Sequence, residues 1–77
     1  MKTTENLLKN VTIGSVVNYY NSIHSEDRTF VVIGHNIDEY GHDVVLIDVK
    51  TFEKMLVSGN NVIDTSRMNG WTTIKAN

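Results

Sequence analysis

The sequence contains no cysteine and no proline, a single alanine (Ala76), and no long apolar run. Without cysteine the chain can form neither disulfides nor thiolate zinc sites or iron–sulfur clusters. No apolar stretch approaches the roughly 20 residues of a membrane-spanning helix, and Met1-Lys2-Thr3-Thr4 is not followed by the apolar core of a secretory signal. We therefore expect a cytoplasmic protein that does not contact a membrane.

The chain is short, with 77 residues, 9 acidic and 7 basic side chains and a formal net charge of −2. A chain of this length forms one domain, residues 1–77, and buries only about 60% of the surface that its unfolded form exposes. With disulfides excluded, oligomerisation is the leading way to stabilise so small a core. The negative net charge disfavours nucleic-acid binding, because such domains usually carry a basic footprint.

Valine, isoleucine and threonine are abundant while leucine is scarce, a composition typical of β-strands. The pattern of apolar residues predicts strands at 12–20, 28–35, 43–49, 54–58 and 70–75, and a single 3₁₀ turn at 62–64. Residues 1–10 are predicted to be a helical or extended segment, with a short helix over 4–9 that contributes Leu7 and Leu8.

The segment 43–49 is apolar on both faces of its predicted strand. Val44 and Leu46 occupy one face, whereas Val45, Ile47 and Val49 occupy the other. A strand of this kind is central in a sheet or covered on both sides. We expect the second face to be covered by the N-terminal leucines or by a second copy of the chain.

Five short strands with a short turn before the fifth resemble the layout of a small SH3-like barrel. Ile13-Gly14-Ser15-Val16-Val17 is similar to the Gly-x-x-Val opening of such barrels, and residues 44–57 resemble their central hairpin. The resemblance covers residues 11–75 and implies an all-β, mainly antiparallel, five-stranded barrel. The ALYDY-type stretch of peptide-binding SH3 domains is absent, so recognition of proline-rich ligands is not implied. The alternative fold is a curved antiparallel sheet with the N-terminal helix across one face.

The candidate binding residues are aromatic side chains and one polar loop. Tyr19 and Tyr20 point to opposite faces of a strand, so one of them faces outward, and with Tyr40 and Trp71 it would form an aromatic surface. The loop before Trp71 adds Ser66, Arg67 and Asn69, a set that suits an anion, a nucleotide or a partner carboxylate. The binding site predicted from the sequence is the set Tyr20, Tyr40, Ser66, Arg67, Asn69 and Trp71. A loop that merely caps the end of the barrel, with Trp71 in the core, is the alternative interpretation.

Signals for catalysis or metal binding are weak. His35 and His42 bracket a turn that carries carboxylates, which allows a two-histidine metal site, but two polar residues beside a solvated loop explain the same pattern. The sequence has no Gly-x-Ser-x-Gly turn and no glycine-rich phosphate loop. We therefore predict no enzymatic activity, no cofactor and no metal.

The sequence favours a small binding protein that works by contact. Its length, its asparagine-rich composition and its lack of catalytic motifs resemble the short accessory proteins of phages and mobile elements, which implies a host protein as partner and modulation or inhibition as function. Self-association into a homo-oligomer is a further expectation. One alternative is a nucleic-acid-binding barrel similar to KOW or Tudor modules, and another is a protein that sequesters a small anionic ligand or nucleotide at a subunit interface.

Overall fold

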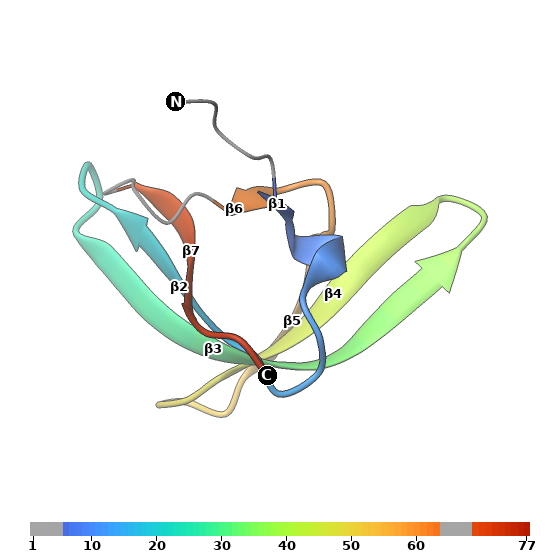
Figure 1. Cartoon of the computed structure of the whole chain (residues 1–77). Coiled ribbons are helices and arrows are strands. Elements are labelled where there is room, and N and C mark those ends of the chain that lie inside the picture. The colour runs from blue at the N-terminus through green and yellow to red at the C-terminus, as the bar shows by residue number, and fades with distance from the viewer. Residues whose placement is uncertain (1–5, 64–68) are drawn as a thin grey trace.

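The computed structural model describes residues 6–63 and 69–77, which form one curled, all-β sheet (Figure 1). Its elements are β1 (Asn6–Leu7), a 3₁₀ turn η1 (Leu8–Asn10), β2 (Val16–Asn21), β3 (Glu26–Asp38), β4 (Gly41–Asp48), β5 (Lys54–Ser58), β6 (Val62–Ile63) and β7 (Gly70–Lys75). The strand order is β1-β6-β7-β2-β3-β4-β5. All neighbours are antiparallel except β6 and β7, which makes the sheet a mostly antiparallel half-barrel.

Strand β3 gives the sheet its curvature. It has 13 residues, pairs with β2 along its first half, and pairs with β4 from Phe30 onward. Between Val32 and Gly34 the register with β4 shifts by one residue, which is a β-bulge opposite Val45. Bulges bend a strand and increase its twist. The two arms of β3 therefore rise on either side of the fold and enclose a concave face (Figure 1).

The hydrophobic core lies on this concave face. Alternating side chains of the three central strands point inward, and residues from the N-terminal segment, β6 and β7 cover them. The buried apolar residues are Leu8, Val17, Phe30, Val32, Val44, Leu46, Ile63 and Trp71. Two predicted pairings are confirmed, because Phe30 and Val32 share the buried face of β3 while Val44 and Leu46 share that of β4.

The predicted N-terminal helix is wrong over the described residues, which form the two-residue strand β1 and the single turn η1. The Leu8 N–H donates to the carbonyl of Asn61 at 2.9 Å, and the Lys9 N–H donates to that of Gly59 at 3.1 Å. An isolated helix of six residues is marginal in water. Long-range hydrogen bonds and complete burial of Leu8 therefore select the extended form.

The predicted five-stranded barrel is also too simple. All five predicted strands form, but β1 and β6 add two short ones and make seven. Val62–Ile63, predicted as a 3₁₀ turn, is a strand because Ile63 pairs with Asn6 on one side and with Trp71 on the other. These pairings join residues far apart in the sequence, so no local sequence pattern predicts them.

Two strand boundaries differ from the predicted ones because the residues of the adjoining turns determine where the strands begin and end. β2 begins at Val16 rather than at residue 12, because Gly14 has a φ of 97° and turns the chain. The turn predicted over 36–42 contracts to residues 39–40, so β3 and β4 form a long hairpin. In this turn the Asp38 carboxylate accepts the N–H groups of Tyr40 at 2.8 Å and Gly41 at 3.1 Å. Among the described residues, no helix is long and apolar enough to cross a bilayer.

Candidate aromatic pocket

The concave face holds a small aromatic pocket of about 150 Å³ at the β2–β3–β7 side of the sheet. Sheet register assembles it, because Tyr19 on β2 lies opposite Arg28 on β3 and opposite Trp71 on β7. Glu26 and Phe30 flank Arg28 at the alternate positions of β3 that face the same side. The lining residues are Tyr19, Glu26, Arg28, Phe30, Met55 and Trp71.

Three aromatic rings form the wall of the pocket. The ring centroids of Tyr19 and Trp71 are 5.0 Å apart with an interplanar angle of 54°, and those of Phe30 and Trp71 are 5.6 Å apart at 47°. Tilted aromatic pairs at these distances attract one another beyond the area they bury. Phe30 and Trp71 are buried, while Tyr19 and Met55 are half-buried. The buried rings of Phe30 and Trp71 therefore form the apolar floor of the pocket, and the half-buried Tyr19 and Met55 form the part that a ligand can reach.

The charged residues of the pocket lining, Glu26 and Arg28, together with the ion-pair partners of Arg28, carry a net negative charge. The guanidinium of Arg28 lies 4.9 Å from the centroid of the Phe30 ring, and it forms ion pairs with Asp48 at 2.9 Å and with Glu53 at 3.1 Å. With Glu26 at the rim, this group contains three carboxylates and one guanidinium, a formal net charge of −2. A cation or an apolar group therefore suits the pocket better than an anion.

Asp48 connects the pocket to the β4–β5 turn. One of its oxygens accepts the backbone N–H groups of Lys50 at 2.7 Å and Thr51 at 3.1 Å, and the other accepts the Arg28 Nε–H at 2.9 Å. The hydrogen bond from Lys50, followed by that from Arg28, holds the pKa of the Asp48 carboxyl below its usual range. The same hydrogen bond to Asp48 raises the pKa of Arg28. The ion pair is thus part of the fold as well as of the pocket.

We expect the stability of the protein to fall in acid because of Asp48. A carboxyl whose pKa is lowered on folding stabilises the native state above its unfolded pKa of about 4, and that stabilisation is lost as pH falls through the lower folded value. Urea midpoints measured between pH 6 and pH 2 should therefore drop less steeply in Asp48→Asn than in the wild type. Glu39→Gln, at an exposed carboxylate in the β3–β4 turn, is the control. Parallel pH profiles of Asp48→Asn and the wild type would contradict this assignment.

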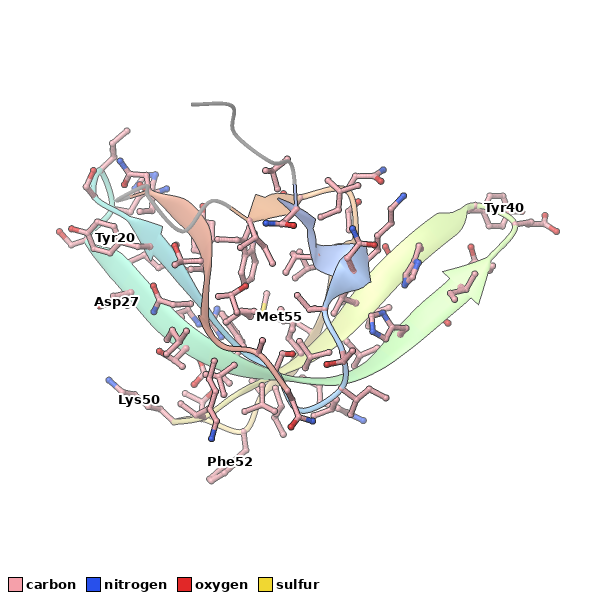
Figure 2. All side chains as sticks on the ribbon, in the orientation of Figure 1. Tyr20, Asp27, Tyr40, Lys50, Phe52 and Met55 are labelled. Atoms are coloured by element: carbon pink, nitrogen blue, oxygen red, sulfur yellow. The ribbon has the colours of Figure 1, made fainter. Side chains whose placement is uncertain are left out.

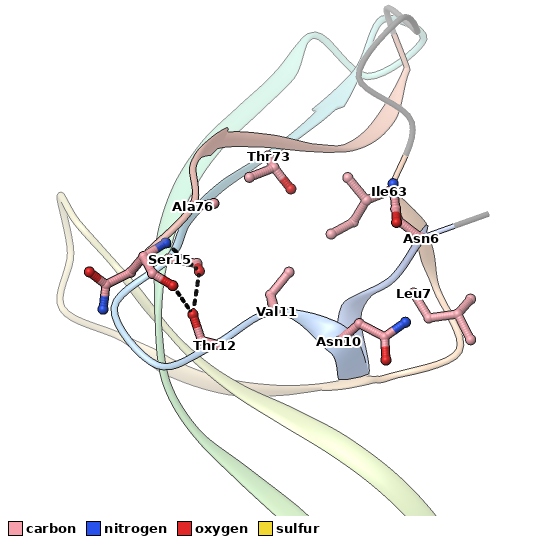
Figure 3. A pocket seen from close by; sticks show the side chains of 10 residues that line it. Asn6, Leu7, Asn10, Val11, Thr12, Ser15, Ile63, Thr73 and Ala76 are labelled. Carbon is pink, nitrogen blue, oxygen red and sulfur yellow. Dashed lines mark hydrogen bonds between the residues drawn. The ribbon is translucent and has the colours of Figure 1, made fainter. Parts of the chain in front are cut away.

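A second cavity, of about 240 Å³, lies between the N-terminal segment, β6 and the C-terminal strand (Figure 3). Its walls carry neutral amides and hydroxyls together with apolar side chains, and none of its described lining residues is charged. Its polar groups already bond to one another, because Thr12 bonds to Ser15 at 3.3 Å and to the carbonyl of Asn77 (Figure 3). This cavity offers no ionic anchor for a nucleotide or another anion.

The two histidines that bracket the β3–β4 turn do meet. Nδ1 of His35 lies 2.9 Å from Nε2 of His42, and Nε2 of His35 lies 2.9 Å from the carbonyl oxygen of Val11. Because a carbonyl only accepts, His35 carries its proton on Nε2, and in the neutral pair its Nδ1 accepts the Nε2–H of His42. The histidine pair thus links the backbone at Val11 to the β3–β4 hairpin through hydrogen bonds. No group of three or more metal-ligating side chains occurs among the described residues.

The structure separates the residues that the sequence placed in one aromatic surface. Tyr40 is 89% exposed at the tip of the β3–β4 hairpin, and Tyr20 lies on the opposite arm of the sheet (Figure 2). Trp71 is buried in the core, and the Asn69 side chain accepts the N–H of Ser22 at 2.8 Å. Ser66 and Arg67 lie outside the described residues. Of the predicted residues that the structure describes, only Trp71 lines the aromatic pocket.

Sequence reasoning overlooked most of the pocket residues. Glu26, Arg28 and Phe30 alternate along one strand, and this i, i+2 spacing is the signal that could have grouped them on one face. The predicted strand began at Arg28, which left Glu26 in a turn. Met55 and Asp48 come from other strands, so their place beside the pocket depends on sheet register alone.

Comparison with known protein families, with curated proteins and with solved structures finds no match for this chain.

Proposed function

We propose that this chain is a small, non-catalytic protein-binding module whose aromatic pocket receives a basic side chain of a partner protein. The observation that carries the proposal is the pocket itself, which combines three aromatic rings with a surrounding net charge of −2. The methylene groups of lysine or arginine pack against Trp71 and Met55, and the cationic end lies near Glu26. The interaction needs no chemistry beyond contact.

A host protein in the cytoplasm is the partner class that we propose, because short accessory proteins of phages and mobile elements resemble this chain in length and composition. The SH3-like layout belongs to the same proposal, and its support is the meander β2-β3-β4-β5 with β7 returning beside β2. The nucleic-acid alternative is weaker at this pocket, since the carboxylates that surround it repel phosphate.

A titration with short peptides tests the proposal directly. The probes are acetylated, amidated Gly-X-Gly peptides in which X is lysine, arginine, norleucine or glutamate, and the readout is the amide and Trp71 indole shifts in ¹H–¹⁵N spectra. We expect lysine and arginine peptides to shift Trp71 and Glu26 with millimolar affinity, norleucine to bind more weakly, and glutamate to bind least.

The matched variants separate charge from folding. Glu26→Gln should weaken the lysine peptide about threefold, in line with about 0.6 kcal/mol for a half-exposed charge pair, while leaving norleucine unchanged. Glu39→Gln, at an exposed carboxylate in the β3–β4 turn, should change neither. Equal binding of lysine and glutamate peptides would overturn the proposal, and salt-sensitive binding of an octathymidylate at the same residues would favour the nucleic-acid alternative.

A further inference from the structure

The outer, convex face of the sheet carries apolar side chains that no described segment covers. Register places Val16, Val31 and Ile47 in one row across β2, β3 and β4, and it places Val45 beside Leu56 in the next row. Ile33, in the bulge, adds to the second row. We call these six residues the outer strip. Leu56 is 57% exposed and Ile33 is 39% exposed, whereas the other four are half-buried.

The described part of the N-terminal segment, residues 6–10, does not cover this strip. Leu8 is completely buried in the concave core, on the opposite face of the sheet. The expectation that the N-terminal leucines cover the second apolar face is therefore wrong for Leu8. Open rows of valine, isoleucine and leucine on a monomer mark a site of association.

Lysines flank the outer strip. Lys75 pairs with Val16, and Lys54 pairs with Ile47, so the central row runs Lys75-Val16-Val31-Ile47-Lys54 across five strands. At the usual strand spacing this row is about 19 Å long. Lys50 and the exposed ring of Phe52 both project from the β4–β5 turn in the lower part of the view (Figure 2). Lys54 and Lys75 place positive charge at the two ends of the central row, although the whole chain is negative.

Of the carboxylates on the convex face, Asp43 lies two residues from Val45 along β4, beside the second row, and Asp27 lies four residues from Val31 along β3. Asp27 pairs with Tyr20 near one end of β3, and Asp43 pairs with Asn36 near the other. Because β3 is curved, both of its ends lie above its middle in the view of Figure 2, and Asp27 lies on one of these raised arms. A surface that approaches the base therefore meets the apolar row and its lysines first.

We propose that the outer strip binds an apolar surface of a partner protein that is bordered by aspartate or glutamate. Such a partner buries the valines and leucine and places carboxylates against Lys54 and Lys75. A second copy of this chain fits poorly. In aligned sheet packing the strands of the two sheets lie within about 30° of one another, and the aligned rows would then set lysine against lysine. The strip is distinct from the aromatic pocket, so the two proposals stand or fall separately.

Selection from a random peptide library displayed on phage tests this inference. The library is selected on the folded wild-type protein and counter-selected on Leu56→Asp, and the recovered peptides are synthesised. We expect them to combine apolar residues with aspartate or glutamate, and to bind Leu56→Asp at least about tenfold more weakly than the wild type. Ile23→Asp, at an exposed apolar residue in the β2–β3 turn, is the control and should bind normally.

A second variant distinguishes loss of binding from loss of folding. The double substitution Lys54→Glu, Lys75→Glu changes two exposed side chains and should weaken the same peptides while thermal unfolding stays unchanged. Recovery of basic peptides, or of peptides insensitive to Leu56→Asp, would overturn the proposal. Two further results would also overturn it by assigning another occupant. In the first, the wild-type protein sediments as a dimer and the Leu56→Asp variant as a monomer. In the second, the wild-type protein binds phosphatidylserine vesicles and the Leu56→Asp variant does not. Glu26→Gln should leave peptide binding unchanged, which keeps this test independent of the aromatic pocket.

Discussion

Replacing Leu8 with alanine is expected to lower the free energy of unfolding by about 3 kcal/mol. Leu8 is completely buried, and it belongs to the same core cluster as Phe30, Leu46 and Trp71. Its backbone is fixed by the hydrogen bond to Asn61, so the segment cannot move to fill the cavity that alanine leaves. In a domain of 77 residues such a loss is a large part of the total stability.

Urea denaturation followed by tryptophan fluorescence measures this effect, because Trp71 is the only tryptophan in the chain and lies in the core. Leu7→Ala is the control. Leu7 is half-buried at the edge strand β1, and its replacement should cost about 1 kcal/mol. Equal losses in the two variants would mean that the N-terminal segment does not complete the core.

Replacing Gly59 with alanine is expected to cost about 2 kcal/mol through overpacking. A Cβ at this position would lie 2.7 Å from the Cβ of Lys9 and 2.8 Å from the carbonyl oxygen of His42. Both contacts are to atoms on or next to the backbone. The chain is held close here, because Gly59 donates its N–H to His42 at 2.8 Å and accepts that of Lys9 at 3.1 Å. The added methyl group must therefore displace either η1 or β4.

Gly34→Ala is the matched control for this substitution. Its Cβ would meet only the side chain of Val45, at 3.9 Å, which is an ordinary van der Waals contact. We expect its free energy of unfolding to stay within about 0.5 kcal/mol of the wild type, or to rise slightly because alanine loses less conformational freedom on folding. A loss in Gly34→Ala as large as that in Gly59→Ala would point to a general intolerance of side chains at these glycines instead of a local clash at Gly59.

The aromatic pocket shows which contacts a local sequence pattern can predict and which it cannot. Alternation along a strand is a property of the backbone, so the sequence was sufficient to place Phe30 with Val32 and Val44 with Leu46. The lateral neighbours of a strand are not encoded in that alternation. Tyr19 faces Trp71 because β7 returns beside β2, and Arg28 reaches Asp48 because β3 and β4 pair in a particular register.

The sequence by itself determined the all-β class, the approximate positions of five strands and the two-faced apolar character of β4, since these depend on residue type and on a period of two. Tertiary structure decided the rest. Hydrogen bonds between the N-terminal segment and residues 59–61 replaced the predicted helix with β1 and η1, and the pairing of β6 with β1 and β7 added two short strands to the five predicted ones. The physical reason is common to both cases. These contacts join residues distant in the chain, and their free energy exceeds the weak local preferences that a sequence pattern reports.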